Sequence, residues 1–347
     1  MRAVLKDFLT GKTHYTGILR RQISLAKETA KKKEKISIIV PCFNEEEALP
    51  LFYDEITKVM KSIRVDYELL LVNDGSKDNT MEVMKRLSKK DKHVLYLSFS
   101  RNFGKESAMY AGFVNATGDY VGVMDADMQD PPSLLPEMVR ILKTEDYDSV
   151  ATRRKTREGE SKVRSFFARA FYRIINKISD SDIIDGARDF RLMKRPMVDA
   201  ILSMTEYNRF SKGIFGWVGF KTYWLAYENV ERVAGTTSWS FWGLFKYAIS
   251  GFVNFSLAPL NIATFIGFAS TGMSFIYLVF VLIKYLLFGD PVQGWATLIC
   301  VILFLGGIQL LCIGIIGQYV GKTYLEVKNR PRYIVSETNK KDIISIK

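Results

Sequence analysis

Histidine and cysteine are both scarce in this chain of 347 residues, which has two histidines and three cysteines. His14 and His93 are too few for a histidine-ligated zinc site or a serine–histidine dyad. Cys42, Cys300 and Cys312 are widely spread, and two of them lie in very apolar sequence, which argues against a disulfide framework and a cysteine-rich metal site. Any acid, base or metal-binding role therefore falls to carboxylates.

Charged residues are missing from two long stretches near the C-terminus. No Asp, Glu, Lys or Arg occurs from Tyr247 to Ile283 or from Pro291 to Gly321. Each stretch exceeds the roughly 20 residues that cross the hydrocarbon core of a bilayer. We therefore expect two transmembrane helices, at about 258–284 and 296–319, which form a hairpin within residues 257–320. Two buried helices of a soluble core are the alternative, but soluble helices rarely extend so far without a charged face.

Basic residues flank the outer ends of this hairpin. Lys246 precedes it, and Lys322, Lys328, Arg330 and Arg332 follow it. The positive-inside rule then places both termini, and the domain that precedes the hairpin, in the cytoplasm, so we expect a multi-pass protein of the cytoplasmic membrane. Residues 321–347 would form a basic cytoplasmic tail.

Two further segments have a composition that suits a membrane surface. Residues 1–35 form a basic extension without the apolar core of a signal peptide, so they are either a solvated or helical extension or a segment drawn to anionic lipid. Residues 236–256 are rich in aromatic side chains, which favour the headgroup layer, although packing in a core is an alternative.

The sequence between these segments alternates short β-branched runs with helical patterns. A composition with 48% hydrophobic residues is too apolar for a disordered polyelectrolyte, despite the net charge of +12. Strands are predicted at 36–40, 67–72, 94–99, 120–124 and 148–152, and helices at 46–61, 79–89, 105–116 and 133–142. This order predicts an α/β domain over residues 36–235, with a mostly parallel sheet covered by helices. Ligands bind such sheets at the carboxyl ends of the strands.

Polar side chains follow three of the predicted strands at this edge. Asp125 and Asp127 come after the fourth strand and, two residues apart, can point the same way. With Gln129 and Asp130 they form an oxygen-rich set without histidine, which suits Mg²⁺ or Mn²⁺ rather than zinc. The alternative is a cluster that caps the following helix.

Several segments together carry a family resemblance. They are IVPCFNEEE, LLVNDGSKDNT, SRNFGKESAMYAG, GDYVGVMDADMQDPP, ARDFRLMKR and AGTTSWSFW. This set resembles the family 2 glycosyltransferases of the GT-A fold, which is Rossmann-like. Within that family it is similar to the polyprenyl-phosphate glycosyltransferases: the bactoprenol glucosyltransferases and, more distantly, dolichol-phosphate mannose synthase. The resemblance covers about residues 35–327.

The resemblance implies a nucleotide-sugar site at the strand ends. The residues that match positions of this site are Pro41, Glu45, Asp74, Lys105 and Asp125. By the same resemblance Asp74 accepts a hydrogen bond from the pyrimidine ring, and Lys105 lies near the donor. Asp125, Asp127 and Gln129 would hold the metal ion, Mg²⁺ or Mn²⁺.

The resemblance also implies a reaction centre around Asp189, with Arg191 close by in sequence. Arg153, Arg164 and Lys212 are weaker candidates for contacts with a diphosphate or a lipid phosphate, because each could equally belong to a solvated face. A phosphate monoester is largely dianionic at pH 7, so a phosphate acceptor hardly needs a general base. We therefore expect Asp189 to orient the acceptor, a cation or a sugar hydroxyl, with proton abstraction as the alternative.

The implied reaction transfers a sugar, glucose or another hexose, from a nucleotide sugar to polyprenyl (undecaprenyl) phosphate with inversion. UDP is favoured over GDP as the nucleotide, and the product would be a donor for cell-envelope glycans. The expected partners are the nucleotide sugar, the lipid phosphate and the membrane, with no nucleic acid. Small residues along the spans would permit a homo-oligomer.

Two other functions stay open at this point. A processive polysaccharide synthase is disfavoured because two spans are few for an export channel and a Gln-x-x-Arg-Trp block is absent. A non-catalytic nucleotide-binding membrane subunit is disfavoured because the acidic motifs are all present.

Overall fold

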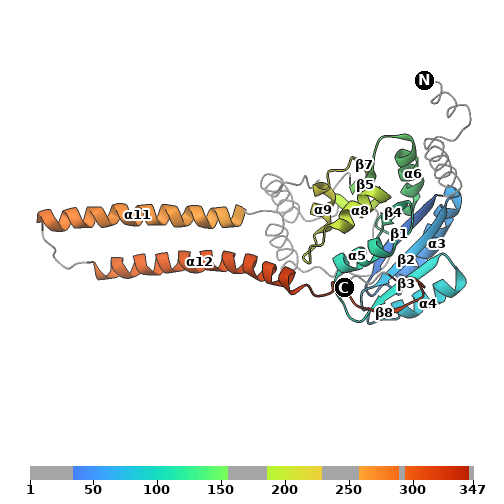
Figure 1. The fold of residues 1–347 in the computed structure, drawn as a ribbon, viewed down its shortest axis with the longest axis horizontal. Coiled ribbons are helices and arrows are strands. Elements are labelled where there is room, and N and C mark those ends of the chain that lie inside the picture. Colours follow the sequence, from blue (N-terminus) through green and yellow to red (C-terminus); the bar gives the residue numbers. More distant parts are fainter. Residues whose placement is uncertain (1–33, 155–185, 229–257, 289–293, 344–347) are drawn as a thin grey trace, which may run out of the picture.

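Residues 34–154, 186–228, 258–288 and 294–343 are described by a computed structural model. An α/β domain contains most of them, and two long helices extend from it as a hairpin (Figure 1). The predicted N-terminal extension and the aromatic segment at 236–256 lie outside the described residues, apart from the last two residues of the extension.

One sheet runs through the domain in the strand order β7-β5-β6-β4-β1-β2-β3-β8. The strands are β1 (Lys35–Cys42), β2 (Asp66–Asn73), β3 (Val94–Phe99), β4 (Tyr120–Val123), β5 (Ser149–Arg154), β6 (Ala187–Lys194), β7 (Thr222–Tyr227) and β8 (Val335–Thr338). Strands β4, β1, β2 and β3 are parallel neighbours, and β5 is parallel to β7. β6 is antiparallel to β4 and β5, and β8 is antiparallel to β3. The prediction of a mostly parallel α/β sheet is confirmed.

Helices cover both faces of this sheet (Figure 1). They are α3 (Ala48–Ile63), α4 (Thr80–Lys90), α5 (Lys105–Asn115), the short 3₁₀ helix η1 (Pro132–Leu134), α6 (Leu135–Thr144), α8 (Arg195–Ser203) and α9 (Ser211–Trp217). The first five strands and the first four α-helices match the sequence-based ranges to within about two residues at each end. β6, β7, β8, α8 and α9 were not predicted.

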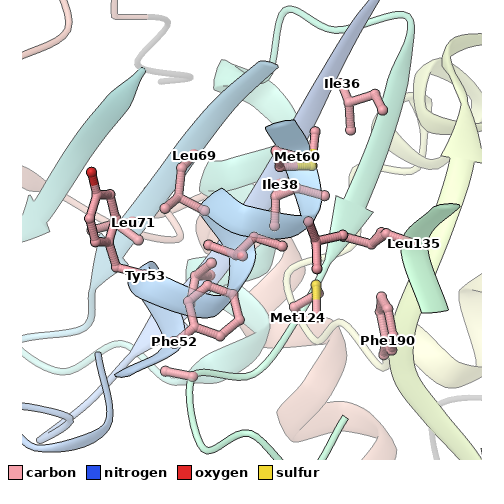
Figure 2. Packing of buried hydrophobic residues seen from close by; sticks show 14 of the residues in the cluster. Ile36, Ile38, Phe52, Tyr53, Met60, Leu69, Leu71, Met124, Leu135 and Phe190 are labelled. Carbon is pink, nitrogen blue, oxygen red and sulfur yellow. The ribbon is translucent and has the colours of Figure 1, made fainter. Parts of the chain in front are cut away.

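The central strands bury side chains on both faces, because successive residues of a strand point to opposite sides. Ile38 and Leu69 belong to the core beneath α3, α4 and α6, where Phe52 of α3 packs (Figure 2). Ile39 and Leu70, the next residues along each strand, belong to the core beneath α5, α8 and α9. This two-sided burial explains the nearly continuous apolar runs of β1 and β2.

The chain returns to the sheet after the hairpin. α12 (Trp295–Lys328) is capped by Asn329. Tyr333, a little further along the chain, is buried and stacks on Phe99 at 5.0 Å between ring centroids. β8 then pairs with the free edge of β3. The residues assigned from the sequence to a basic tail therefore include the last turns of α12 and an edge strand. β8 has the sequence VSET, which lacks the apolar run that identified the inner strands.

The two long helices are α11 (Ala258–Phe288) and α12, and each is long and apolar enough to cross a membrane. Their candidate spans are Pro259–Tyr277 and Phe304–Lys328, of which only 6% and 0% is buried inside the protein. The core helix of a soluble protein would be mostly buried, so these exposed apolar surfaces suit a lipid environment.

Away from the carboxyl edge, Glu68 of β2 collects four hydrogen bonds. Its Oε1 accepts from the Ser37 hydroxyl at 2.6 Å and the Thr117 backbone N–H at 2.7 Å, while Oε2 accepts from Lys35 Nζ at 2.7 Å and the Thr117 hydroxyl at 2.9 Å. Burial alone would raise the pKa of Glu68, but these donors and the charge of Lys35 hold that pKa below its ordinary value.

We expect Glu68→Gln to destabilise the protein at pH 7 by about 1–3 kcal/mol, since buried donors lose a charged acceptor. The folded-state pKa is lowered, so the stabilisation is present above the unfolded-state pKa of about 4.3 and is lost as the pH falls through the folded-state value. Thermal unfolding in detergent at pH 7 and pH 4 should show a difference between variant and wild type that shrinks at pH 4. Glu55→Gln, which removes an exposed ion pair with Lys58, is the control and should change little. Equal shifts for both variants would contradict this assignment.

Candidate active site

The site lies where β4 ends and β6 begins. β6 is antiparallel to β4, and Val123 is paired with Arg191. If this register is continued two residues further, Asp125 lies opposite Asp189. The topology therefore brings together two acids that are 64 positions apart in the chain (189 − 125 = 64).

Lys105, the first residue of α5, joins these two acids. Its Nζ lies 2.7 Å from Asp125 Oδ1 and 2.6 Å from Asp189 Oδ2. Partial burial opposes the charge of Lys105, but both carboxylates raise its pKa above the ordinary lysine value. Burial would likewise raise the pKa of Asp189, yet Lys105 first, and then Lys212 and Arg191, lower it well below the ordinary range. Lys105, Asp125 and Asp189 thus form a charged triad, in which two carboxylates surround one ammonium.

Asp74 fixes the loop that leads into Lys105. Its two carboxylate oxygens accept hydrogen bonds from the backbone N–H groups of Phe103, at 2.6 Å, and Gly104, at 2.9 Å. Burial raises the pKa of Asp74, and these two hydrogen bonds oppose the rise. Gly75 packs against the loop before Lys105 so closely that a Cβ at this position would lie 2.4 Å from the carbonyl carbon of Arg101, so a larger residue would not fit. Asp74 thus positions the start of α5, and its contact with a pyrimidine stays a prediction.

The loops after β1 and β2 are tied together beside this site. Asn44 donates its backbone N–H to the Ser76 hydroxyl at 3.0 Å, and Glu45 donates its own to the Thr80 hydroxyl at 2.8 Å. Glu45 lines a cavity of about 370 Å³ between the two loops. Pro41 lies in β1, paired with Val72 of β2, so it precedes the same loop. The predicted donor residues of these two strands therefore gather at one edge of the sheet.

Arg188 fixes the acidic loop after β4, which contains Asp125, Asp127, Gln129 and Asp130. Its Nη2 donates to Gln129 Oε1 at 3.1 Å, and its Nε donates to Asp130 Oδ1 at 3.1 Å. Asp130 is 1% exposed and also accepts from the Tyr227 hydroxyl. Asp127 is 7% exposed and accepts the backbone N–H of Gln129 at 3.1 Å. Sequence reasoning missed Arg188, although its place beside Asp189 in ARDFRLM was a usable signal.

The residues of this loop fit a hard divalent cation in their donor chemistry. Asp125, Asp127 and Gln129 supply only oxygen ligands, which Mg²⁺ and Mn²⁺ prefer. In the part of the chain that the structure describes, no group of three or more His, Cys, Asp or Glu side chains is placed to hold a metal by itself. A cation here would therefore share its shell with substrate phosphates or water.

The remaining candidates differ in position. Arg191 is 3% exposed, and its guanidinium lies 3.6 Å above the centroid of the Phe215 ring, beneath the surface of the site. Burial lowers the pKa of Arg191 to about 9, against the opposing charge of Asp189. Lys212 at the start of α9 is close enough for its charge to act on Asp189. Arg153 is exposed on β5, and Arg164 lies outside the described residues.

Comparison with known proteins decides the family. The sequence model described as "Glycosyl transferase family 2" matches residues 37–202. The putative glycosyltransferase CsbB of Bacillus subtilis is 45% identical over 308 residues, which are 89% of this chain and 93% of that protein. The chain belongs to glycosyl transferase family 2. It is a glycosyltransferase, and the expectation from the resemblance is confirmed.

Other relatives have more specific names. The prophage bactoprenol glucosyl transferase homolog of Escherichia coli K12 is 42% identical over 306 residues, covering 88% of this chain and 100% of that protein. Among solved structures, mannosyl-3-phosphoglycerate synthase from Rubrobacter xylanophilus aligns with a TM-score of 0.45 and 18% identity, over 67% of this chain and 73% of that one. The family assignment of the glycosyltransferase rests on the sequence relatives.

We expect Arg188→Lys to lower turnover by about tenfold or more, because a single ammonium cannot reproduce the two directed N–H bonds to Gln129 and Asp130. Arg195→Lys is the matched control. Arg195 follows the other end of β6 and donates to backbone oxygens of Ala116 and Gly118, so its replacement should affect stability rather than turnover. Steady-state rates at matched folded fraction test this expectation, and equal rate losses in the two variants would contradict it.

Proposed function

We propose that this glycosyltransferase transfers a hexose, glucose in the first instance, from a UDP-sugar to polyprenyl phosphate at the cytoplasmic face of the membrane. One observation carries the proposal: the charged triad of Lys105, Asp125 and Asp189 lies in the same chain as a hairpin of membrane-length helices. The name of the bactoprenol glucosyl transferase relatives supports the lipid acceptor and the sugar.

The donor would bind along the carboxyl edge of β1, β2 and β4. Pro41, Glu45 and Asp74 are proposed to line the nucleoside pocket beside the cavity between the first two loops. Asp125, Asp127 and Gln129 would hold Mg²⁺ or Mn²⁺ together with the diphosphate. A bound divalent cation stabilises the charge that develops on a leaving diphosphate.

The acceptor phosphate would approach the side of the site where Lys105 and Lys212 supply positive charge. One of its oxygens attacks the anomeric carbon, while the bond from that carbon to the nucleoside diphosphate breaks. A single displacement of this kind inverts the anomeric centre. The acceptor is already largely dianionic at pH 7, so no proton has to be removed.

Asp189 is proposed to hold the charged Lys105 side chain in position rather than to act as a base. Its carboxylate is paired with Lys105 at 2.6 Å, and its lowered pKa makes it a weak proton acceptor. Its role would be to hold the Lys105 ammonium between donor and acceptor. Arg191, buried against Phe215 below it, would support the local field without touching the substrate.

The hairpin suits a lipid acceptor, whose chain stays in the bilayer while its phosphate remains at the surface. The basic residues that flank the spans favour a cytoplasmic position for both termini and for the catalytic domain. The described part of the chain has two candidate spans, which are few for an export channel. A distributive transfer of one sugar therefore suits the protein better than processive synthesis.

The function is tested by incubating the purified protein with undecaprenyl phosphate and, separately, UDP-glucose, UDP-N-acetylglucosamine, UDP-galactose and GDP-mannose. Extracted lipids are then weighed by mass spectrometry. We expect the lipid to gain the mass of one hexose with a UDP-hexose. A polymer ladder would favour a synthase, and nucleotide-sugar consumption without a lipid product would contradict the acceptor assignment.

We expect Asp127→Asn to lower turnover by about 100-fold or more at saturating UDP-sugar, because the proposed cation loses a charged ligand. The same variant should bind Mn²⁺ more weakly, as measured by electron paramagnetic resonance of the free ion. Asp146→Asn is the control, since Asp146 is exposed and pairs with Lys221 at the surface. Full activity of Asp127→Asn, or of the wild type in excess EDTA, would contradict the metal assignment.

We expect Asp189→Asn to lower kcat while the acidic limb of the pH profile of kcat/KM persists. That limb would follow ionisation of the acceptor phosphate near pH 6, because Asp189 is already ionised well below that pH. The profile is measured for wild type and variant at saturating metal. Loss of the acidic limb in Asp189→Asn would identify Asp189 as the general base.

A further inference from the structure

The segment that connects α8 to α9, together with the first residue of α9, is held at two points by carboxylates from distant parts of the chain. Glu326, near the end of α12, accepts the backbone N–H of Tyr207 at 2.8 and 2.9 Å and that of Asn208 at 3.2 Å. Glu106 of α5 accepts the backbone N–H of Ser211 at 3.1 Å on each oxygen, and also the Ser211 hydroxyl. We call residues 204–211 the clamped segment.

Two arginines reinforce the clamped segment against α5. Arg332, which follows α12, donates to the backbone oxygens of Thr205 and Glu206. Arg209 donates to the backbone oxygen of Met204 at 2.7 Å. Both guanidinium groups lie over the ring of Tyr110, a buried residue of α5, at 4.7 and 4.6 Å from its centroid. The C-terminal end of α12, the clamped segment and α5 are therefore packed as one unit.

The clamped segment ends beside the reaction centre. Glu106 directly follows Lys105, and Ser211 directly precedes Lys212. The Glu106–Ser211 contact thus joins the starts of α5 and α9, the two helices that carry these lysines. A shift of the clamped segment would move Lys212 relative to Lys105 and Asp189, and displacements of about 1 Å are enough to slow a reaction substantially.

We propose that Glu106 and Glu326 are positioning residues that hold the clamped segment and thereby keep Lys212 in place beside the triad. Through Glu326 the end of the membrane hairpin sets the geometry of the acceptor side of the site. Hydrogen bonds from backbone N–H groups to a carboxylate are charge-assisted, which makes these contacts stronger than neutral ones. The inference rests on the proposed function, because it assigns the acceptor phosphate to the Lys212 side.

The first test compares Glu106→Gln, Glu326→Gln and the double variant in the full-length protein in detergent. We expect each single variant to lower kcat by about tenfold and to raise KM for undecaprenyl phosphate, with the Kd for UDP-glucose changed less than twofold. The fold-loss of kcat in the double variant should be smaller than the product of the two single fold-losses, since both residues hold the same segment. Glu337→Gln is the matched control, because Glu337 lies in β8 and pairs with Lys85 at the far edge of the sheet.

A second measurement is independent of turnover. Hydrogen exchange should become faster in Glu326→Gln at the amides of Tyr207 and Asn208, and also at Ser211, which Glu326 does not contact. The inference would be overturned if faster exchange were confined to Tyr207 and Asn208. It would also be overturned if the losses of kcat multiplied in the double variant, or if the affinity for UDP-glucose fell in parallel. A wild-type protein that makes no lipid-linked sugar would instead contradict the proposed function, and the exchange data would still decide whether the clamp couples its two ends.

Discussion

The triad of Lys105, Asp125 and Asp189 is the interaction on which the rest of the site depends. Two partly buried carboxylates, placed where β4 ends and β6 begins, repel each other unless a cation lies between them. Lys105 supplies that charge at 2.7 and 2.6 Å. Other contacts support this placement: Asp74 holds the loop before Lys105, and Glu106, directly after it, anchors α9.

The sheet topology explains why the triad forms at this edge. In a parallel sheet the loops that follow the strands lie together at their carboxyl ends. The first residues of β6 lie at the same edge, because β6 is antiparallel to β4. The chain that leaves the helical hairpin then returns to the sheet as β8 and closes the edge of β3. The catalytic sheet and the hairpin are thus joined by more than a linker, because Glu326, Arg332 and Tyr333 all contact the α/β domain.

Much of the fold was predictable from local patterns, and the site only in part. Apolar β-branched runs identified the inner strands, and the range 94–99 matches β3 at both ends. β8 escaped prediction because an edge strand needs little apolar surface, as its sequence VSET shows. Asp125 was predicted from its position after a strand, and Lys105 and Asp189 from the family resemblance. The contact between the three depends on a strand register that the sequence pattern does not contain. The contact between Glu326 and Tyr207 spans 119 positions, so no local signal could reveal it.

The central claim, that Lys105 is the resident cation between Asp125 and Asp189, is tested most directly by Mn²⁺ binding without nucleotide. Free Mn²⁺ is measured by electron paramagnetic resonance during titration of wild type and Lys105→Met. If the ammonium competes for Asp125, its removal should tighten Mn²⁺ binding even as sugar transfer slows. Unchanged or weaker Mn²⁺ binding in a folded Lys105→Met protein would contradict the account.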